Sequence, residues 1–333
     1  MAPSYDDTTR ASELVPIYAP HIANKTILIT GVSPGSLGES FVKQVAAAKP
    51  SIFILAGRNP TKFQPLIDDV AAAHPDITIK PLTLDLTSLA QVREAASTVN
   101  SWTDVPHIDL LVNNAGIMAV PYALTVDNFE SQFQTNHLSH FLLTNLLMPK
   151  ILAAPDPRVV NVSSGGHRLG VIRWTDHAFD GGRTYGKWAA YGQSKTANAL
   201  FSLALAGRLG ASSSGGLSAF SLCPGYVGTN LGAHGAGDAA GFMESFRRAD
   251  EAMGTRWMWG IGDLRPKDLD EGVATHVYAS FDPELKARNG VYVNDCHVAD
   301  PYKEEVHCWA QSEVDADRLW KLSEKLVGQE FAY

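Results

Sequence analysis

The feature that most constrains the fold is a regular alternation of short apolar segments with longer helix-like ones. Seven short segments rich in Val, Ile, Leu and Phe are predicted as β-strands: residues 26–29, 51–56, 77–82, 108–112, 158–162, 217–222 and 290–294. Helical patterns separate most of them, at residues 39–49, 60–74, 88–100, 128–152 and 191–209. Because nearly continuous apolar strands joined through helices are typical of a parallel sheet covered on both faces, the pattern predicts a doubly wound α/β fold with seven parallel strands.

The size of the chain favours a single domain. Its 333 residues are 45% hydrophobic and 19% charged, which is enough apolar material for one large core. We expect residues 1–23 to be an N-terminal extension and residues 24–330 to form the α/β domain. A Gly-rich stretch at residues 232–241, followed by aromatic and cationic residues, predicts a mobile substrate flap at about residues 231–263. A surface loop without a functional role is an alternative that fits the same composition.

Charge and cysteine content limit the partners and the compartment. The formal net charge of −8 is dispersed without a basic block, so neither nucleic acid nor a membrane surface is expected as a partner. No apolar run is long enough to span a bilayer, and the first seven residues are polar and acidic, unlike a signal peptide. Cys223, Cys296 and Cys308 are too scattered for a disulfide framework or a zinc site. These features predict a cytoplasmic protein, without a metal, that acts on a small molecule.

A Gly-rich turn follows the first predicted strand. In TGVSPGSLGES, residues 30–40, the glycines have the spacing G-x-x-x-G-x-x-G instead of the usual G-x-G-x-x-G. Small residues let the backbone approach a pyrophosphate, and a helix starting near Leu37 directs its free N–H groups toward the phosphates. Ordinary strand-to-helix turns also contain Gly and Pro. The residues predicted to bind a dinucleotide here are Gly31, Ser33, Gly35, Ser36, Leu37 and Gly38.

The end of the second predicted strand indicates which dinucleotide is bound. In a dinucleotide-binding fold, an acidic residue at this point binds the ribose 2′-hydroxyl of NAD, whereas an Arg accommodates the 2′-phosphate of NADP. The segment LAGRN, residues 55–59, has no acidic residue and places Arg58 there, with Lys62 one helical turn later. A planar guanidinium suits a phosphate. We therefore expect NADP(H), although an exposed loop Arg without a ligand is the alternative.

Polar residues also follow the third and fourth predicted strands. Asp85 and Leu86 come after the third strand, and Asn113, Ala115 and Gly116 come at the end of the fourth. Because parallel strands bind ligands at their carboxyl ends, Asp85 is a candidate for the adenine amine and the other three for a cofactor ribose. Asx residues make ordinary turns as well, so neither position decides the question alone.

The most specific group of residues combines Ser164, at the end of the fifth strand, with Tyr191 and Lys195 in YGQSK. On a helix, Tyr191 and Lys195 lie on one face because they are four residues apart. A neighbouring ammonium and an oxidised nicotinamide would lower the phenol pKa from about 10, which makes Tyr191 a proton donor to a ketone oxygen. Ser164 would hold the same oxygen by a hydrogen bond. The Y-x-x-x-K spacing alone is common by chance in helices.

Taken in order, these motifs resemble the short-chain dehydrogenase/reductase family. The resemblance covers roughly residues 24–325. Within the family, the chain is most similar to the branch of the retinol dehydrogenases and WW-domain oxidoreductases. It rests on the TGxxxG turn at Thr30–Gly35, NNAG at Asn113–Gly116, Asn136 in QTNH, Ser164, the Tyr191 and Lys195 pair, and CPGYVGT at Cys223–Thr229. It implies a Rossmann fold and an NADP(H)-dependent enzyme.

The resemblance also implies roles for further residues. Asn136, Ser164, Tyr191 and Lys195 would form a catalytic tetrad, in which Lys195 also holds the nicotinamide ribose and Asn136 anchors a water. Val227 and Thr229 would contact the nicotinamide carboxamide, Leu37 would pack beside the phosphates, and Pro224 would shape the loop. Homo-oligomers are common in the family. We expect no N-terminal membrane anchor of the kind that many retinol dehydrogenases have, so a retinoid substrate is not implied.

Aromatic residues predict the substrate class. Phe242, Trp257 and Trp259 in the flap, if they face inward, indicate a bulky apolar or aromatic carbonyl compound or secondary alcohol. A long insert between Ser164 and Tyr191 adds aromatic residues that either form the substrate mouth or decorate the surface. Two other functions stay open: a cofactor-binding sensor without turnover, and a non-redox enzyme that steers a cyclisation in the same pocket.

Overall fold

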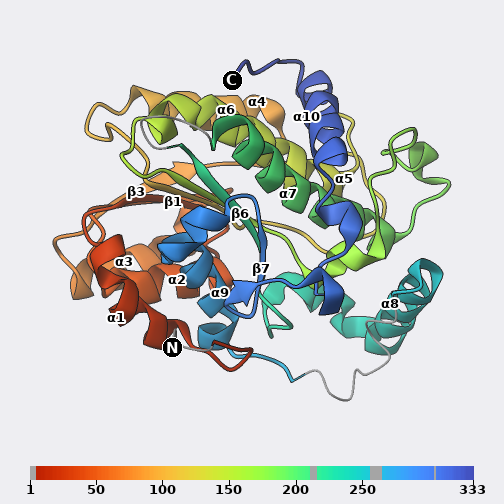
Figure 1. The fold of residues 1–333 in the computed structure, drawn as a ribbon, viewed down its shortest axis with the longest axis horizontal. Helices are drawn as coiled ribbons and strands as arrows, with labels where there is room; N and C mark the ends of the chain where they lie inside the picture. Colours follow the sequence, from red (N-terminus) through yellow and green to blue (C-terminus); the bar gives the residue numbers. More distant parts are fainter. Residues whose placement is uncertain (1–4, 211–215, 256–264, 304) are drawn as a thin grey trace.

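A central sheet forms the middle layer of the molecule (Figure 1). The computed structural model describes residues 5–210, 216–255, 265–303 and 305–333. The strands, in spatial order, are β3 (Thr78–Thr83), β2 (Ile52–Gly57), β1 (Thr26–Thr30), β4 (Leu110–Asn113), β5 (Arg158–Val162), β6 (Ser218–Cys223), β7 (Tyr292–Asn294) and β8 (His297–Val298). The first seven pair in parallel, and each matches a predicted strand to within two residues. The predicted α/β class is therefore confirmed.

The sheet has one strand more than predicted. β8 pairs antiparallel with β7, through Val293 with Val298 and Asn294 with His297. The turn between them places Asp295 and Cys296 at positive φ angles of 44° and 58°. Cys rarely adopts that conformation, and a strand of two residues is too short to produce an alternation in the sequence. The prediction of a purely parallel, seven-stranded sheet was wrong at this edge.

Helices cover both faces of the sheet, which confirms the doubly wound arrangement (Figure 1). On one face, a buried apolar cluster joins the sheet to α4 (Leu89–Ser101), α6 (Ser139–Leu152), α7 (Lys187–Leu209) and α10 (Glu313–Val327). On the other face, a second cluster joins it to α1 (Ala11–Ile22), α2 (Leu37–Ala46), α3 (Gln64–Ala73) and α9 (Leu269–Phe281). Short 3-10 helices connect these elements: η1 (Pro60–Phe63), η3 (Gly165–Leu169), η4 (Asp180–Gly182), η5 (Asn230–Asp238), η7 (Glu284–Arg288), η8 (Pro301–Lys303) and η9 (Cys308–Ala310).

The predicted helix over residues 128–152 is divided in the structure. A short turn, α5 (Ser131–Phe133), leads into one π-helical segment, η2 (Gln134–Leu138), and then into α6. Single π-helical turns inside helices often occur at functional sites. Asn136 lies in the middle of this one, so the irregular turn sets the direction of a predicted catalytic side chain.

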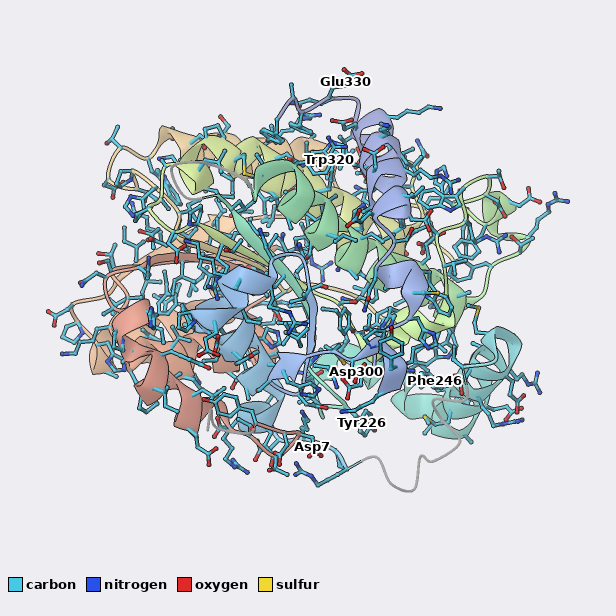
Figure 2. The ribbon with its side chains drawn as sticks, in the orientation of Figure 1. Asp7, Tyr226, Phe246, Asp300, Trp320 and Glu330 are labelled. Carbon is cyan, nitrogen blue, oxygen red and sulfur yellow. The ribbon has the colours of Figure 1, made fainter. Side chains whose placement is uncertain are left out.

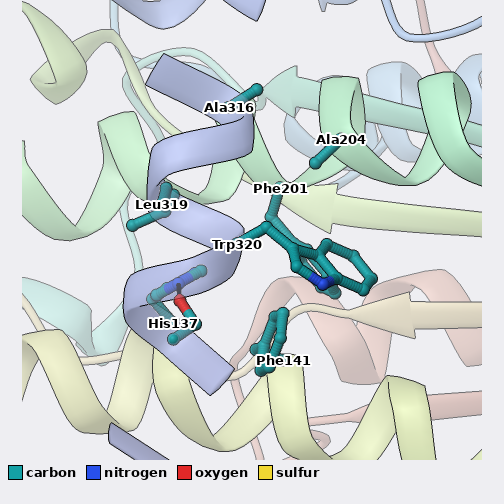
Figure 3. Close-up of a pocket in the computed structure, with 8 residues that line it drawn as sticks. His137, Phe141, Phe201, Ala204, Ala316, Leu319 and Trp320 are labelled. Carbon is teal, nitrogen blue, oxygen red and sulfur yellow. Dashed lines mark hydrogen bonds between the residues drawn. The ribbon is translucent and has the colours of Figure 1, made fainter. Parts of the chain in front are cut away.

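The C-terminal helix α10 packs against the helical segments that carry Asn136, Tyr191 and Lys195 (Figure 3). Trp320 meets Phe141 of α6 edge-on, with ring centroids 5.0 Å apart, and also lies against Phe201 of α7. The buried His137 Nε2 lies 2.8 Å from Ser323 Oγ. Because His137 is next to Asn136 in η2, this contact with α10 stabilises the π-helical turn that carries Asn136.

The segment expected to be an N-terminal extension contributes a helix to the fold. α1 packs along α9, with Leu14, Tyr18 and other side chains buried. Tyr18 Oη donates a 2.8 Å hydrogen bond to Asp282, and Arg10 forms a 2.8 Å ion pair with Asp268. This helix was not predicted because it contains prolines at positions 16 and 20, which normally disfavour helix interiors.

The first part of the predicted flap, which was expected at about residues 231–263, is helical. η5 is followed by α8 (Ala239–Met253), which lies beside the body of the sheet and its helices in Figure 1. Trp257 and Trp259 lie outside the described residues, so their predicted inward orientation is untested. Among the described residues, no helix has both the length and the apolar composition that crossing a membrane requires.

Candidate active site

The predicted cofactor turn and the turn after β4 are hydrogen-bonded to each other. Thr30 Oγ1 accepts the backbone N–H groups of Asn114 (3.0 Å) and Ala115 (2.9 Å). Asn114 Nδ2 in turn donates to the carbonyl oxygens of Thr30 (2.8 Å) and Gly31 (3.1 Å). β1 and β4 are neighbours at the point where the strand order reverses, which is where open α/β sheets bind ligands. The two turns therefore form one rigid floor there.

The glycines of the first turn are required by close backbone contacts. Gly31 has a φ of +77°, and a Cβ there would lie 2.7 Å from the Ala115 Cα. A Cβ on Gly38 would lie 2.4 Å from the Gly31 carbonyl oxygen. Ser36 caps α2 by accepting the Glu39 N–H at 3.2 Å. At Gly31 and Gly38 no side chain covers the backbone beside the N-terminus of α2, and such a site fits the phosphates of a dinucleotide.

One carboxylate lies inside the same turn. Glu39 accepts the Gly35 N–H at 2.6 Å and forms a 3.0 Å ion pair with Lys43. The Gly35 N–H is therefore already occupied within the protein. The Glu39 N–H is bound by Ser36, so the N–H groups of Leu37 and Gly38 are the available donors at the helix N-terminus, and Ser33 is exposed.

Arg58 lies where the sequence places it, directly after β2. It is exposed, and no hydrogen bond or ion pair to its guanidinium is found among the described residues. Asp85, after β3, is half-buried and accepts the N–H and hydroxyl of Thr87, at 2.9 and 2.7 Å. Leu86 is buried, and its carbonyl accepts Ser139 Oγ at 2.6 Å. One carboxylate oxygen of Asp85 thus caps a local turn, while Arg58 is free to meet a ligand.

Asn113 occupies a different place from the one its sequence position suggested. Its side chain is buried in the core, where Nδ2 donates to Thr144 Oγ1 (2.9 Å) and Asn161 Oδ1 (2.8 Å). Its Oδ1 has no hydrogen-bond partner among the described residues. Only the backbone of Asn113 can face a ribose, because strand residues alternate between faces and this side chain points toward α6. Ala115 and Gly116, in contrast, lie at the open edge.

Asn136 links the turn after β4 to α7. Its Oδ1 accepts the Ile117 N–H (2.8 Å), and its Nδ2 donates to the Ile117 carbonyl (2.9 Å) and to Ser194 Oγ (2.8 Å). Both amide hydrogens are thus engaged by the protein, so a water held by Asn136 would have to bind one of its oxygens. A Cβ on Gly116 would lie 3.1 Å from Asn136 Oδ1 and 3.5 Å from Lys195 Nζ, which places these three residues together.

Lys195 and Tyr191 lie on one face of α7, as their spacing predicts. Lys195 Nζ donates to the Val162 carbonyl at 2.9 Å and lies 5.7 Å from the centre of the Tyr191 ring. Burial lowers the pKa of Lys195 to about 8. The Tyr191 ring packs on Gly166, where a Cβ would lie 2.5 Å from the ring.

Burial sets the pKa of Tyr191 in the protein alone. It raises the pKa, and a hydrogen bond from Ser164 opposes that shift. Ser164 Oγ also accepts the Gly166 N–H at 3.0 Å, which orients the hydroxyl. The protein's own groups therefore keep the phenol protonated at neutral pH, and the lowering expected from Lys195 together with an oxidised nicotinamide stays a prediction.

The loop after β6 closes the site from the other side. Val227 forms a β-bridge with Lys267, and the Lys267 N–H donates to the Tyr226 carbonyl at 2.8 Å. A Cβ on Gly272 would lie 2.6 Å from Val227 and 3.0 Å from Leu37. Val227 and Leu37, both predicted cofactor residues, are thus brought together by the first turns of α9. Pro224 begins this loop, and Thr229 caps η5 by accepting the Leu231 N–H at 3.3 Å.

Apolar side chains pack around the buried ring of Tyr191. Trp188 meets the Tyr191 ring edge-on, with centroids 6.2 Å apart, and it also contacts Phe242 and Phe246 of α8. Its Nε1 donates to Ser245 Oγ at 2.9 Å. Phe246 lies on the same side of the view as Tyr226, well away from Trp320 (Figure 2). Met118, Ala119, Leu169 and Ala249 complete this cluster, which we call the aromatic wall.

Most aromatic residues of the insert before Tyr191 do not reach the site. Phe179 is buried under Arg173, and Trp174 lies beneath Arg318. Tyr185 Oη donates to the Val120 carbonyl at 2.9 Å. Trp188 alone among the insert aromatics belongs to the aromatic wall. Of the insert aromatics predicted to form the substrate mouth, only Trp188 packs against α8 beside Tyr191.

Several residues near the site were missed by the sequence analysis. His140 Nε2 lies 3.0 Å from Thr30 Oγ1, and its Nδ1 lies 3.1 Å from the Asn136 carbonyl, so it connects the cofactor turn to η2. Lys267 and Gly272 contact Val227 in the loop after β6. His140 could have been found from the sequence, because it follows Asn136 by one helical turn. Lys267 and Gly272 lie far from the other site residues in the sequence.

Comparison with known proteins decides the family. The model of the short chain dehydrogenase family matches residues 25–237. The chain belongs to the short chain dehydrogenase family. It is 32% identical to human retinol dehydrogenase 11 over 92% of this chain and 87% of that one. It is 33% identical to the oxidoreductase calI of Penicillium decumbens over 93% and 89% of the two chains.

A solved structure agrees with this assignment. A crystal structure of an uncharacterized protein from Mycobacterium paratuberculosis is 32% identical, covers 94% of this chain and 96% of its own, and superposes with a TM-score of 0.67. The predicted retinol-dehydrogenase-like branch and the Rossmann fold are therefore confirmed. As a short chain dehydrogenase, the protein is an oxidoreductase that interconverts alcohol and carbonyl groups with a nicotinamide cofactor.

Proposed function

We propose that this short chain dehydrogenase reduces the carbonyl group of a bulky apolar or aromatic small molecule with NADPH, and catalyses the reverse oxidation with NADP+. The observation that carries the proposal is the convergence of Ser164, Tyr191, Lys195 and Asn136 beside the Gly-rich turn, at the edge of the sheet where α2 begins. Oxidation of NADPH, followed by absorbance with a panel of ketones and aldehydes, tests it.

The bare backbone at Gly31 and Gly38 and the N-terminus of α2 fit a pyrophosphate. When bound, the cofactor supplies the hydride. Its adenosine and ribose groups would be lined by Asp85, Leu86, Ala115 and Gly116, and its carboxamide would contact Val227 and Thr229. Lys195 uses one of its three ammonium hydrogens on the Val162 carbonyl, so the other two could hold a ribose hydroxyl.

The protein's own groups perform the proton transfer in this proposal. Tyr191 donates its phenol proton to the carbonyl oxygen of the substrate, while the Ser164 hydroxyl hydrogen-bonds the same oxygen and stabilises the charge that develops there. Because burial keeps Tyr191 protonated at neutral pH, the free protein is poised for reduction. The nearby Lys195, with a pKa of about 8, is mainly protonated at pH 7 and stabilises the phenolate left behind.

The aromatic wall supports the proposed substrate class. Trp188, Phe242 and Phe246 form an apolar surface next to the Tyr191 ring, in which the Trp188 ring is edge-on to the other two. We expect Trp188→Ala to raise KM for a bulky aromatic ketone about tenfold, because it removes most of this surface, which contributes roughly 1–3 kcal/mol. A small aliphatic ketone, assayed with the same variant, should show little change. Equal losses for both ketones would contradict the assignment.

Arg58 is the residue that we propose selects NADPH over NADH. Its guanidinium has no partner among the described residues, and it stands at the strand end that faces the adenosine ribose. We expect Arg58→Ala to raise KM for NADPH about 10- to 100-fold, because a charge-assisted contact with the 2′-phosphate is lost, and to leave KM for NADH within about twofold.

Arg288→Ala is the matched control for this change in charge. Arg288 is also exposed and lies in η7, after α9. This control should leave the preference for NADPH intact. If wild-type protein uses NADH as well as NADPH, or if Arg58→Ala affects both cofactors equally, Arg58 does not read the 2′-phosphate.

The remaining proposals concern assembly and location. The three cysteines are free thiols in the structure, and two of them are buried, which supports the proposed cytoplasmic location. A homo-oligomer and the boundary of the domain at residue 24 stay predictions.

A further inference from the structure

We infer that His167 is a positioning residue that holds Ser164 in its catalytic orientation and connects it to the C-terminal segment of the chain. This inference rests on the proposed reductase function. His167 lies in η3, three residues after Ser164, and its side chain is fully buried. The Ser164 carbonyl accepts two hydrogen bonds from it, from the backbone N–H at 3.0 Å and from ring Nδ1 at 2.8 Å.

The partners of the ring fix its tautomer. His167 Nε2 accepts the backbone N–H of His307 at 3.1 Å, and an amide N–H can only donate. Nδ1 faces the Ser164 carbonyl, which can only accept. The proton therefore sits on Nδ1, and a second proton on Nε2 would point at another donor. Burial also lowers the pKa of His167 to about 3, so the ring is a neutral hydrogen-bonding group over the whole working range.

The backbone of His167 is held as firmly as its ring. Its carbonyl accepts Trp309 Nε1 at 3.0 Å and Thr196 Oγ1 at 3.1 Å. Thr196 is the neighbour of Lys195 on α7, so His167 joins the strand end that carries Ser164 to the helix that carries Tyr191. Tyr292 of β7 adds its hydroxyl 3.3 Å from Nδ1.

The C-terminal segment thus reaches the back of the catalytic site. His307 stacks on Trp309, with ring centroids 4.4 Å apart, and its Nε2 lies 3.2 Å from Arg168 Nη1. Both residues lie beyond residue 237, where the match to the family model ends. A part of the chain outside the matched region therefore contributes contacts that fix Ser164. Because a misplacement of about 1 Å at a reacting group can cost about 10²-fold in rate, the direct bond between the His167 ring and the Ser164 carbonyl is the contact with the largest expected kinetic consequence.

Two substitutions separate the two ring contacts. In His167→Asn, the amide nitrogen takes the place of Nδ1 and keeps the bond to the Ser164 carbonyl, whereas the bond to His307 is lost. In His167→Gln, the amide oxygen reaches the place of Nε2 and keeps the bond to His307, whereas the ring bond to Ser164 is lost. We expect kcat to fall about tenfold or more in His167→Gln and to stay within about threefold of wild type in His167→Asn. KM for NADPH should change by less than about twofold in both.

Tyr18→Phe is the control for lost stability alone, since it removes a buried 2.8 Å hydrogen bond in α1. It should lower Tm without lowering kcat. A His167→Gln variant with wild-type kcat, or an Asn variant that loses as much as the Gln variant, would overturn the inference while leaving the reductase function intact.

Nitrogen-15 NMR of wild-type protein gives a readout that is independent of turnover. His167 should show the Nδ1–H tautomer and should not titrate between pH 5 and 9. Titration near pH 6.5, or the Nε2–H tautomer, would refute the hydrogen-bond arrangement even if both variants fail to fold. An enzyme that binds NADPH but turns over no carbonyl compound would instead count against the proposed function, and the NMR result would then decide the hydrogen bonding of His167 by itself.

Discussion

Replacing Tyr191 with Phe is expected to reduce kcat for carbonyl reduction by about 10²- to 10⁴-fold while leaving NADPH affinity within about twofold of wild type. The substitution removes only the hydroxyl that donates the proton. The ring stays in place, because it packs on Gly166 and against Trp188. The loss therefore falls on the proton transfer and not on the shape of the site.

Stopped-flow NADPH oxidation and a fluorescence titration of NADPH binding measure the two quantities separately. Tyr278→Phe serves as the control, since it removes a second phenol whose pKa burial raises, on α9. This control should retain full turnover. If Tyr191→Phe kept its rate of NADPH oxidation, another group would have to supply the proton.

The same variant distinguishes the two other functions that the sequence leaves open. A cofactor-binding sensor would keep its biological activity in Tyr191→Phe, because cofactor binding is preserved. A cyclisation enzyme would form product without net consumption of NADPH. The intact tetrad geometry favours the reductase over both.

Replacing Gly31 with Ala is expected to abolish detectable NADPH binding and to lower the free energy of unfolding by about 2–6 kcal/mol. A φ of +77° costs a non-glycine residue about 1–3 kcal/mol. The new Cβ would also lie 2.7 Å from the Ala115 Cα, a backbone atom, and such overpacking costs about 1–3 kcal/mol more. The turn after β4 would have to move away, which would separate the two halves of the cofactor floor.

Gly328→Ala isolates the conformational part of this cost. Gly328 has a φ of +68° at the end of α10, and a Cβ there would meet no atom within 4 Å. Chemical denaturation should show a loss of only about 1–3 kcal/mol for this control, with unchanged NADPH binding. Similar binding constants for Gly31→Ala and wild type would show that the turn does not approach the phosphates.

The sequence predicts most of the sheet because its inner strands are buried on both faces and so appear as continuous apolar runs. β1 and β6 are buried along their whole length, and they were readily recognised. β8 and α1 were missed for local reasons. A two-residue strand has no period, and the prolines of α1 oppose a helix that packing against α9 nevertheless stabilises.

The positions of the proposed tetrad residues could be anticipated because their spacing reflects a single helix face and adjacent strand ends. The directions in which individual side chains point could not be anticipated from the sequence. Asn113 follows the same strand edge as Ala115, yet its amide is buried against α6. The pKa of Tyr191 could not be predicted either, because desolvation depends on which surfaces cover the ring, and Trp188 and Gly166 are brought there only by the fold.

The β-bridge between Val227 and Lys267 has a practical consequence for engineering. The two ends of the stretch at residues 228–266 lie next to each other at this bridge, held by the Lys267 N–H on the Tyr226 carbonyl. A stretch whose ends are held together in this way can be replaced without altering the strands on either side. We expect that residues 230–266 can be exchanged with those of a relative to transplant substrate preference, while Thr229, the cofactor floor and the tetrad remain those of the recipient.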